Sequence, residues 1–239
     1  MKIKYLIVTA FLFSLHKNVE TQNSAKSELE SILKEYKGDF NFSFSAKYKY
    51  YENLTTKIVS DSLDSYTRIH NDEFYFKISD YEMVGNTDYS LFVDHKSKQI
   101  VLEGFLEQQK KKRRLGYIES ILQTSGATIT EFDPVNGLKG FSIDYKDQQI
   151  KSADITYDPN THRINKCTIK YLEDINVKTG QYEFSRLEII YTNYVKKNDP
   201  IGTDYGLVKF IDLKNNKSYS IQGQFARYEF INLTPLKKN

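Results

Sequence analysis

The chain has 239 residues and a formal net charge of +3, and 39% of its residues are hydrophobic, 27% charged and 14% aromatic. This composition is that of a globular protein, and the length gives one large or two small domains with an ample core. Its only cysteine, Cys167, excludes an internal disulfide, and the 19 Tyr and 15 Phe without any Trp favour a sheet-rich fold.

The first residues differ in kind from the rest of the chain. Lys2 and Lys4 precede an apolar run from Tyr5 to Leu15, and a polar stretch follows at 16–23. This order is typical of a secretory signal, and the run is too short to span a membrane. We therefore predict a signal peptide at 1–21 and a mature chain of 22–239. The alternative is a buried N-terminal strand or helix.

Removal of this segment changes the charge balance. The formal net charge falls from +3 to +1, because Lys2, Lys4, Lys17 and Glu20 are lost with it. A nearly neutral exported chain is not expected to bind nucleic acid. Exported chains without disulfides are commoner in bacteria than among small eukaryotic secreted domains, so we predict a periplasmic or secreted bacterial protein.

A helix and a long strand open the mature chain. Ser27 and Glu30 form a capping box, and Leu29, Ile32, Leu33 and Tyr36 lie on one stripe, which predicts a helix over 24–38. The segment DFNFSFSAKYKYY, 39–51, alternates without interruption, which predicts a strand with one aromatic face. That face either lines a ligand cavity or packs against the helix.

Short alternating segments separated by turns fill most of the remaining chain. They predict strands at 54–61, 65–70, 74–79, 89–94, 99–103, 128–132, 140–145, 153–157, 163–172, 182–195, 208–213 and 219–233, the last with a bulge or bend. The short connections favour an antiparallel meander. The segment 105–126 lacks alternation and has helical spacing, so we predict helices there. Because no repeat or linker is visible, we predict a single domain over 22–239.

This order of elements resembles the LolA/LolB superfamily, the periplasmic lipoprotein-carrier fold, whose LolA-like members are common in Bacteroidetes. Three segments between 28 and 195 carry the resemblance: YTRIHNDEFYFK, YSLFVDHKSKQIVLE and ADITYDPNTHRINKCTIKY. The first places Arg68 before the aromatic run Phe74–Phe76. Two positions depart from the family pattern, because Ile69 stands where Pro is usual and Tyr75 where Arg is frequent.

The resemblance implies a mainly β (α+β) protein, an incomplete antiparallel barrel or half-barrel with an N-terminal helix and a helical lid at 105–125. It implies a lipid, or the acyl chains of a lipoprotein, held in the concave face. The expected apolar lining is Phe40, Phe42, Phe44, Tyr48, Tyr50, Phe74 and Phe76. Arg68 would latch the lid by donating to its backbone carbonyls. The alternative for Arg68 is an ordinary exposed strand residue.

No motif for catalysis or cofactor binding is present. The sequence lacks the nucleophile-elbow, phosphate-loop and dinucleotide-binding patterns, and its four histidines, His16, His70, His95 and His162, do not have metal-ligand spacing. Cys167 lies in an alternating segment, which favours a structural thiol. We expect neither an enzyme nor a cofactor.

The densest charge lies at Lys110, Lys111, Lys112, Arg113 and Arg114. This run is either a solvated helix face or a contact with anionic lipid headgroups or an acidic partner. We expect a monomer that binds a lipid or an acylated protein, with an envelope membrane protein as a further partner. The alternative function is a non-catalytic envelope adaptor or assembly module with a filled core, which binds a protein through its polar face or a free sheet edge.

Overall fold

The computed structural model describes residues 28–29, 31–32, 41–104, 128–134, 137–145, 150–175, 182–196, 199–214 and 218–234. Almost all of its regular structure in these ranges is β-strand. The elements are β1 (Asn41–Tyr51), β2 (Asp61–His70), β3 (Glu73–Ile78), β4 (Tyr81–Gly85), β5 (Tyr89–Asp94), β6 (Gln99–Gly104), β7 (Thr128–Phe132), β8 (Lys139–Asp144), β9 (Ile150–Asp158), β10 (Arg163–Ile175), β11 (Tyr182–Lys196), η1 (Leu207–Lys209), β12 (Ile211–Lys214), β13 (Ser218–Ile221), η2 (Gly223–Phe225) and β14 (Glu229–Asn232).

Twelve of these strands follow one hydrogen-bonded order, β14-β6-β5-β4-β3-β2-β1-β11-β10-β9-β8-β7, and β12 and β13 form a separate hairpin. The strand pairs from β2 to β6 and from β7 to β11 are antiparallel, while β14 joins β6 in parallel. The predicted mainly β, antiparallel architecture is therefore confirmed. Its closure into a half-barrel stays a prediction, and the predicted signal at 1–21 and lid at 105–125 lie outside the described residues.

Contacts divide the chain into two compact units that interleave in sequence. Unit 1 holds 1–38, 46–63 and 115–192, and unit 2 holds 39–45, 64–114 and 193–239. Strands β1, β2 and β11 contribute residues to both units.

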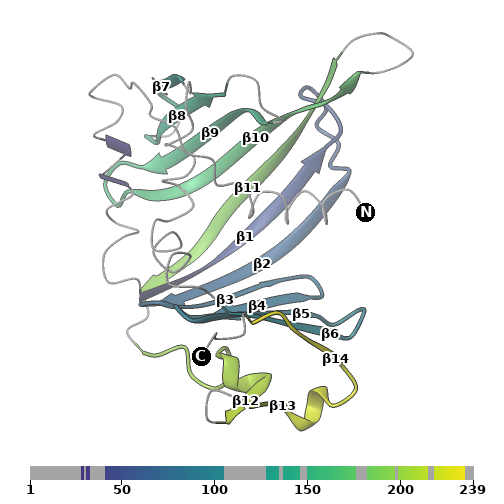
Figure 1. Ribbon diagram of the computed structural model, residues 1–239. Helices are drawn as coiled ribbons and strands as arrows, with labels where there is room; N and C mark the ends of the chain where they lie inside the picture. The colour runs from purple at the N-terminus through teal and green to yellow at the C-terminus, as the bar shows by residue number, and fades with distance from the viewer. Residues whose placement is uncertain are drawn as a thin grey trace. The chain divides into compact units, whose positions relative to one another are not determined.

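The core of unit 1 is the apolar side of strands β7 to β10, which lie side by side in Figure 1. Phe141 on β8 and Tyr157 on β9 stack with their ring centroids 5.4 Å apart and are both fully buried. Leu29 and Ile32, from the segment predicted as a helix, pack into the same cluster. The four described residues of that segment are helical, and the other residues of 24–38 lie outside the described part.

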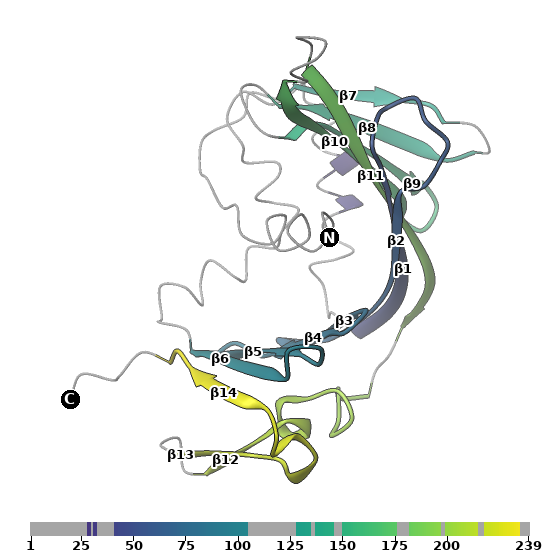
Figure 2. The same cartoon turned by 90° about the vertical axis from the view of Figure 1, so that its right-hand side faces the viewer.

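Unit 2 is a meander whose one side is covered by the C-terminal segment, residues 199–234. Figure 2 shows β12 and β13 beyond one side of strands β3 to β6, while β14 continues the sheet next to β6. From that segment Leu207, Phe210, Ile211 and Phe225 pack onto the strands. The strands contribute Tyr75, Val84, Leu91, Val93, Ile100 and Leu102 to this core.

Three predicted strands differ from the structure. Residues 54–60 form a loop, and β2 begins at Asp61, so the strand predicted at 54–61 is wrong. The reason is local, because the Asn53 side chain accepts hydrogen bonds from the backbone amides of Thr55 and Thr56 and so turns the chain. The segments predicted as strands at 208–213 and 219–233 contain β12, β13 and β14 but also the short helices η1 and η2. The bend predicted within 219–233 is therefore confirmed.

Candidate functional site

The two sides of the unit 2 meander differ in how far their side chains are buried. The registers place Ile69, Phe74 and Gly85 opposite one another on one side, and Thr67, Phe76, Met83, Phe92 and Val101 follow on that same side. We call this the aromatic side. Its Phe74, Phe76, Met83 and Phe92 are half-buried, whereas the opposite side is closed by the C-terminal segment. Half-buried rings are able to take a further apolar partner.

The N-terminal part of β1 adds aromatic rings to unit 2. Phe42 and Phe44 stack with their ring centroids 5.9 Å apart, and Tyr194 of β11 lies 5.3 Å from Phe44. All three side chains are half-buried. Alternation places Phe42 and Phe44 on one side of β1, as the sequence predicted, while Ser43 between them is buried on the other.

The remaining residues of the predicted lining have different environments. Tyr48 is half-buried and Tyr50 is buried, and both belong to unit 1. Phe40 lies outside the described residues. Four of the seven predicted lining residues, Phe42, Phe44, Phe74 and Phe76, are therefore half-buried rings of unit 2. Their role in binding stays a prediction.

Arg68 is buried, with a relative exposure of 7%, so it is not an ordinary exposed strand residue. It lies on the covered side of unit 2, opposite Tyr75 in the register. Its Nη2 donates to the backbone oxygens of Asp199 and Pro200 at 3.1 and 2.8 Å and pairs with the Asp199 carboxylate at 2.6 Å. It binds backbone carbonyls, as a latch would, but those of the C-terminal segment. Residues 105–125 lie outside the described part, so the predicted latch to them stays a prediction.

A buried polar cluster lies between the meander and the C-terminal segment, and sequence reasoning did not find it. Glu82 on β4 has a relative exposure of only 3%. Its carboxylate accepts from Tyr75 Oη at 2.9 Å and from Lys209 Nζ at 2.7 Å, and His95 Nε2 lies 2.9 Å away. The other ring nitrogen of His95 lies 2.8 Å from the Tyr228 hydroxyl. The cluster thus ties β3, β4 and the β5–β6 turn to η1 and to the start of β14.

The electrostatics of this cluster favour a charged carboxylate. Burial alone would raise the pKa of Glu82, but hydrogen bonds from Lys209, Tyr75 and His95 outweigh it and hold that pKa below its ordinary value of 4.5. Burial, together with the neighbouring Glu82 charge, raises the pKa of Tyr75 well above 10. One sequence signal points to the cluster: Glu82 alternates in phase with the buried Val84.

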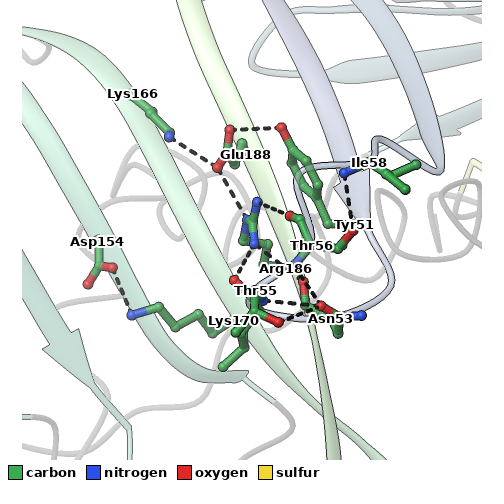
Figure 3. A network of polar contacts seen from close by, with 11 residues as sticks. Tyr51, Asn53, Thr55, Thr56, Ile58, Asp154, Lys166, Lys170, Arg186 and Glu188 are labelled. Atoms are coloured by element: carbon green, nitrogen blue, oxygen red, sulfur yellow. Dashed lines mark hydrogen bonds and ion pairs between the residues drawn. The ribbon is translucent and has the colours of Figure 1, made fainter.

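A second polar network holds the connection between β1 and β2 in unit 1 (Figure 3). Arg186 on β11 lies over the Tyr51 ring, 3.9 Å from its centroid, and donates through Nε to Glu188 at 3.3 Å. Lys166 pairs with the same carboxylate at 3.2 Å, and the Tyr51 hydroxyl donates to it at 3.3 Å. The Arg186 Nη atoms donate to three carbonyls, those of Asn53, Leu54 and Thr56. No sequence motif singles out these residues.

The residues that the structure describes give no support for a metal site or a reactive thiol. In that part of the chain, no three His, Cys, Asp or Glu side chains come together in a way that could hold a metal ion. Burial, followed by the Asp154 charge, raises the pKa of the Cys167 thiol to about 12, which keeps it protonated and non-nucleophilic at neutral pH. Also within the described ranges, no helix has the length and apolar character needed to cross a membrane.

An open depression of about 670 Å³ lies on the C-terminal segment. Its lining is mostly polar, so it does not match the apolar cavity that the resemblance implies. The lining residues are Thr203, Asp204, Val208, Lys209, Gln222, Gly223 and Gln224. The basic run at 110–114 lies outside the described residues, so its contacts stay predictions.

Comparison with known proteins bears on the fold. No protein-family model matches the chain, and no curated protein sequence does. Among solved structures, the chain is similar to a LolA superfamily protein from Nitrosomonas europaea, at 9% identity over 72% of this chain and 94% of that one, with a TM-score of 0.33. The chain resembles the LolA superfamily. The superfamily of this neighbour is the one that the sequence resembles.

Two further solved structures show the same kind of likeness. One is an uncharacterized conserved protein from Thermus thermophilus, at 8% identity over 85% of this chain and 98% of that one, with a TM-score of 0.46. The other is LprF from Mycobacterium bovis, at 13% identity over 78% of this chain and 99% of that one, with a TM-score of 0.40. At these identities the likeness concerns the fold and not the activity.

Proposed function

We propose that this LolA-like protein is a non-catalytic binding protein of the bacterial envelope that takes up an apolar ligand, a lipid or the acyl chains of a lipoprotein. The ligand would lie on the aromatic side of unit 2, against Phe74 and Phe76, and would also contact the Phe42 and Phe44 rings of β1. Uptake would be reversible sequestration, with the ligand passed to an envelope membrane partner.

The difference between the two sides of unit 2 carries this proposal. On the covered side, Val84, Leu91, Val93, Ile100 and Leu102 have no exposed surface, because the chain's own C-terminal segment packs on them. On the aromatic side, the rings keep part of their surface accessible. Each ring that an acyl chain covers completely removes apolar area from water, at about 25 cal/mol per Å². Stacked aromatic rings give a broad apolar surface without a demand for hydrogen bonds.

The proposal is tested by the lipid content of the protein recovered from the cells that express it. We expect native mass spectrometry to show a bound lipid of defined mass, and a fluorescent fatty acid to compete with it. Phe44→Asp places a charge among the rings, and we expect it to weaken uptake of the fatty acid about ten-fold or more.

Val195→Asp is the matched control, because Val195 is exposed, follows Tyr194 directly and points to the other side of β11. It should leave uptake unchanged. A protein without bound lipid that takes up no fatty acid, and in which Phe44→Asp lowers only the melting temperature, would contradict the proposal.

The alternative, an envelope adaptor that binds a protein partner, is favoured by a different observation. Each unit contains a packed core of its own, with Phe141 and Tyr157 in unit 1 and Phe210 and Phe225 in unit 2. Neither core needs a ligand to fill it. An apo protein that captures an envelope protein, and loses it when a surface residue is changed, would establish this function instead.

The predicted location rests on the first residues of the sequence. We propose that the chain is exported and cleaved after residue 21, because Lys2 and Lys4 precede an apolar run of signal length. N-terminal sequencing of the protein recovered from the periplasm tests this. A mature N-terminus at Gln22 is expected, and an intact Met1 in the cytoplasmic fraction would contradict it.

A further inference from the structure

The connection between β1 and β2, residues 52–60, is held in a fixed shape. Ser60 N donates to Tyr50 O at 2.9 Å and closes its base. Within it, Asn53 Oδ1 accepts from the amides of Thr55 at 3.1 Å and Thr56 at 2.7 Å, and Ile58 N donates to Thr56 Oγ1 at 3.1 Å. We call residues 52–60 the β1–β2 loop.

Arg186 fixes this loop from the strand side. Its side chain is only 14% exposed, and its guanidinium donates to carbonyls on both sides of the turn at Thr55. Glu188 and the Tyr51 ring hold the guanidinium itself in place. A bound Arg with several acceptors immobilises the backbone that it contacts, so the loop is preorganised rather than loose.

This rigid loop presents three aliphatic side chains to solvent, beside the exposed Glu52, Asn53, Thr55, Lys57 and Ser60. Ile58 is 77% exposed, the highest value among the exposed large hydrophobic residues of the described chain, and Leu54 and Val59 are also exposed. We call these three residues the apolar tip. Figure 3 shows that Ile58 joins the network only through its backbone N, while its side chain points away from the contacts around Arg186. Single exposed aliphatic residues are ordinary, but here three lie within six residues of one clamped loop.

We propose that the apolar tip inserts into the headgroup region of an anionic bilayer and docks the protein on a membrane surface. Lys57 directly precedes Ile58 and Val59, whereas Glu52, the one acidic residue of the loop, lies at its start, and the half-buried Lys49 lies on the strand that leads into it. Aliphatic side chains that enter the interface beside ammonium groups match a bilayer with acidic lipids, since the chains gain apolar burial and the lysines remain at the phosphates.

The composition of the tip argues against a protein occupant. Stable protein interfaces bury about 800 Å² on each partner and centre on Trp, Tyr or Arg. Here the exposed large hydrophobic side chains are three aliphatic residues, and the aromatic ring and guanidinium nearby, Tyr51 and Arg186, are occupied with each other. A second copy of the chain would meet the same small surface.

The absence of Trp from the sequence makes a direct test possible. Ile58→Trp introduces a single Trp at the tip, and Val208→Trp places one at another exposed aliphatic position as the matched control. With vesicles of phosphatidylglycerol and phosphatidylcholine, we expect the Trp emission of the Ile58→Trp variant to shift to the blue and to be quenched by brominated acyl chains. The emission of the Val208→Trp variant should not change.

Co-sedimentation with the same vesicles gives a second readout. The double variant Ile58→Ser/Val59→Ser should bind them about ten-fold more weakly than the unchanged protein, whereas Val208→Ser should bind equally well. Fatty-acid uptake should be retained by the loop variant and vesicle binding by Phe44→Asp, so membrane docking and ligand binding are measured separately.

Two outcomes overturn the proposal. An unshifted, unquenched emission from the Ile58→Trp variant on anionic vesicles would exclude insertion of the tip. A change of oligomeric state in the Ser double variant, with unchanged vesicle binding, would assign the tip to contact with a second copy.

Discussion

At the scale of single residues, Glu82 shows how the C-terminal segment is attached to the meander. A buried carboxylate is costly unless charged and hydrogen-bonded partners surround it, and Lys209 in η1 supplies the charge. The hydrogen bond from Lys209 to Glu82 thus connects β4 with a segment more than a hundred residues later in the sequence. Arg68 repeats this arrangement at β2 with Asp199 and Pro200.

Glu82→Gln is expected to lower the free energy of unfolding at pH 7 by about 3 kcal/mol, because it leaves the Lys209 ammonium partly buried without its partner. The pKa of Glu82 is lowered in the folded state. The contribution of Glu82 to the free energy of unfolding is therefore complete above its ordinary pKa of 4.5. This contribution is lost as the pH falls through the pKa of Glu82 in the folded state.

The stability difference between the unchanged protein and Glu82→Gln should consequently shrink between pH 7 and pH 3. Urea denaturation of both proteins at pH 7 and at pH 3 measures this difference. Glu103→Gln, at an exposed position on β6, is the control and should change little at either pH. A difference that grows on acidification would mean that the partners of Glu82 do not favour its charged form.

In unit 1, we expect a substitution of Arg186 to lower the stability in a similar way. Arg186→Lys retains the charge but not the planar guanidinium that reaches the carbonyls of Asn53, Leu54 and Thr56. We therefore expect it to lower the free energy of unfolding by about 2 kcal/mol. Hydrogen exchange should become faster in residues 52–60 than in β7 and β8. Arg227→Lys, at an exposed position, is the control and should change neither the free energy of unfolding nor the exchange in residues 52–60. Unchanged exchange in the loop would show that Asn53 suffices to hold it.

At the scale of elements, alternation and turn residues identified most strands. The strand predicted at 128–132 matches β7, and those at 74–79, 89–94 and 99–103 match β3, β5 and β6 within one residue. These elements depend on local patterns. The prediction at 54–61 failed because Thr55, Ile58 and Val59 have high β-propensity, whereas Asn53 and the distant Arg186 bind the backbone as a loop. The parallel pairing of β14 with β6 joins segments about 130 residues apart and leaves no local signal.

Gly85, at the end of β4, is a position where the sheet has no space for a side chain. A Cβ there would lie 2.6 Å from the Phe74 ring and 2.7 Å from the Tyr89 carbonyl oxygen. We expect Gly85→Ala to cost about 2 kcal/mol, because the strand or the ring must move.

Gly223→Ala is the matched control, since nothing lies within 4 Å of the position its Cβ would take. Chemical denaturation should show a change for it of no more than about 0.5 kcal/mol. Phe74→Leu/Gly85→Ala should recover only part of the loss, because the Tyr89 carbonyl remains. Full stability of Gly85→Ala alone would show that the ring is not fixed against the strand.

At the scale of the whole molecule, the sequence identified the class of fold better than the site. Periodicity predicted a mainly β antiparallel protein, and the order of segments supported the resemblance. The sequence predicted on which side of a strand each aromatic residue lies. It did not predict how deeply each one is buried, because alternation does not show what covers each side of the sheet. Tyr75 is buried under the C-terminal segment, while its neighbours Phe74 and Phe76 are half-buried on the other side. The Glu82 and Arg186 networks assemble residues from distant elements, and no spacing encodes them.

The division into two units, with three strands that contribute to both, makes a prediction about cooperativity. Phe141 lies fully buried in the core of unit 1 and Phe210 in that of unit 2. Because β1, β2 and β11 continue from one unit into the other, loss of either core should release strands that the other requires. We therefore expect Phe141→Leu and Phe210→Leu each to lower the stability by about 1–2 kcal/mol and to shift one common unfolding transition. Calorimetry, with hydrogen exchange read separately in β8 and β5, measures this. Two transitions, with each substitution moving only one of them, would show that the units unfold independently.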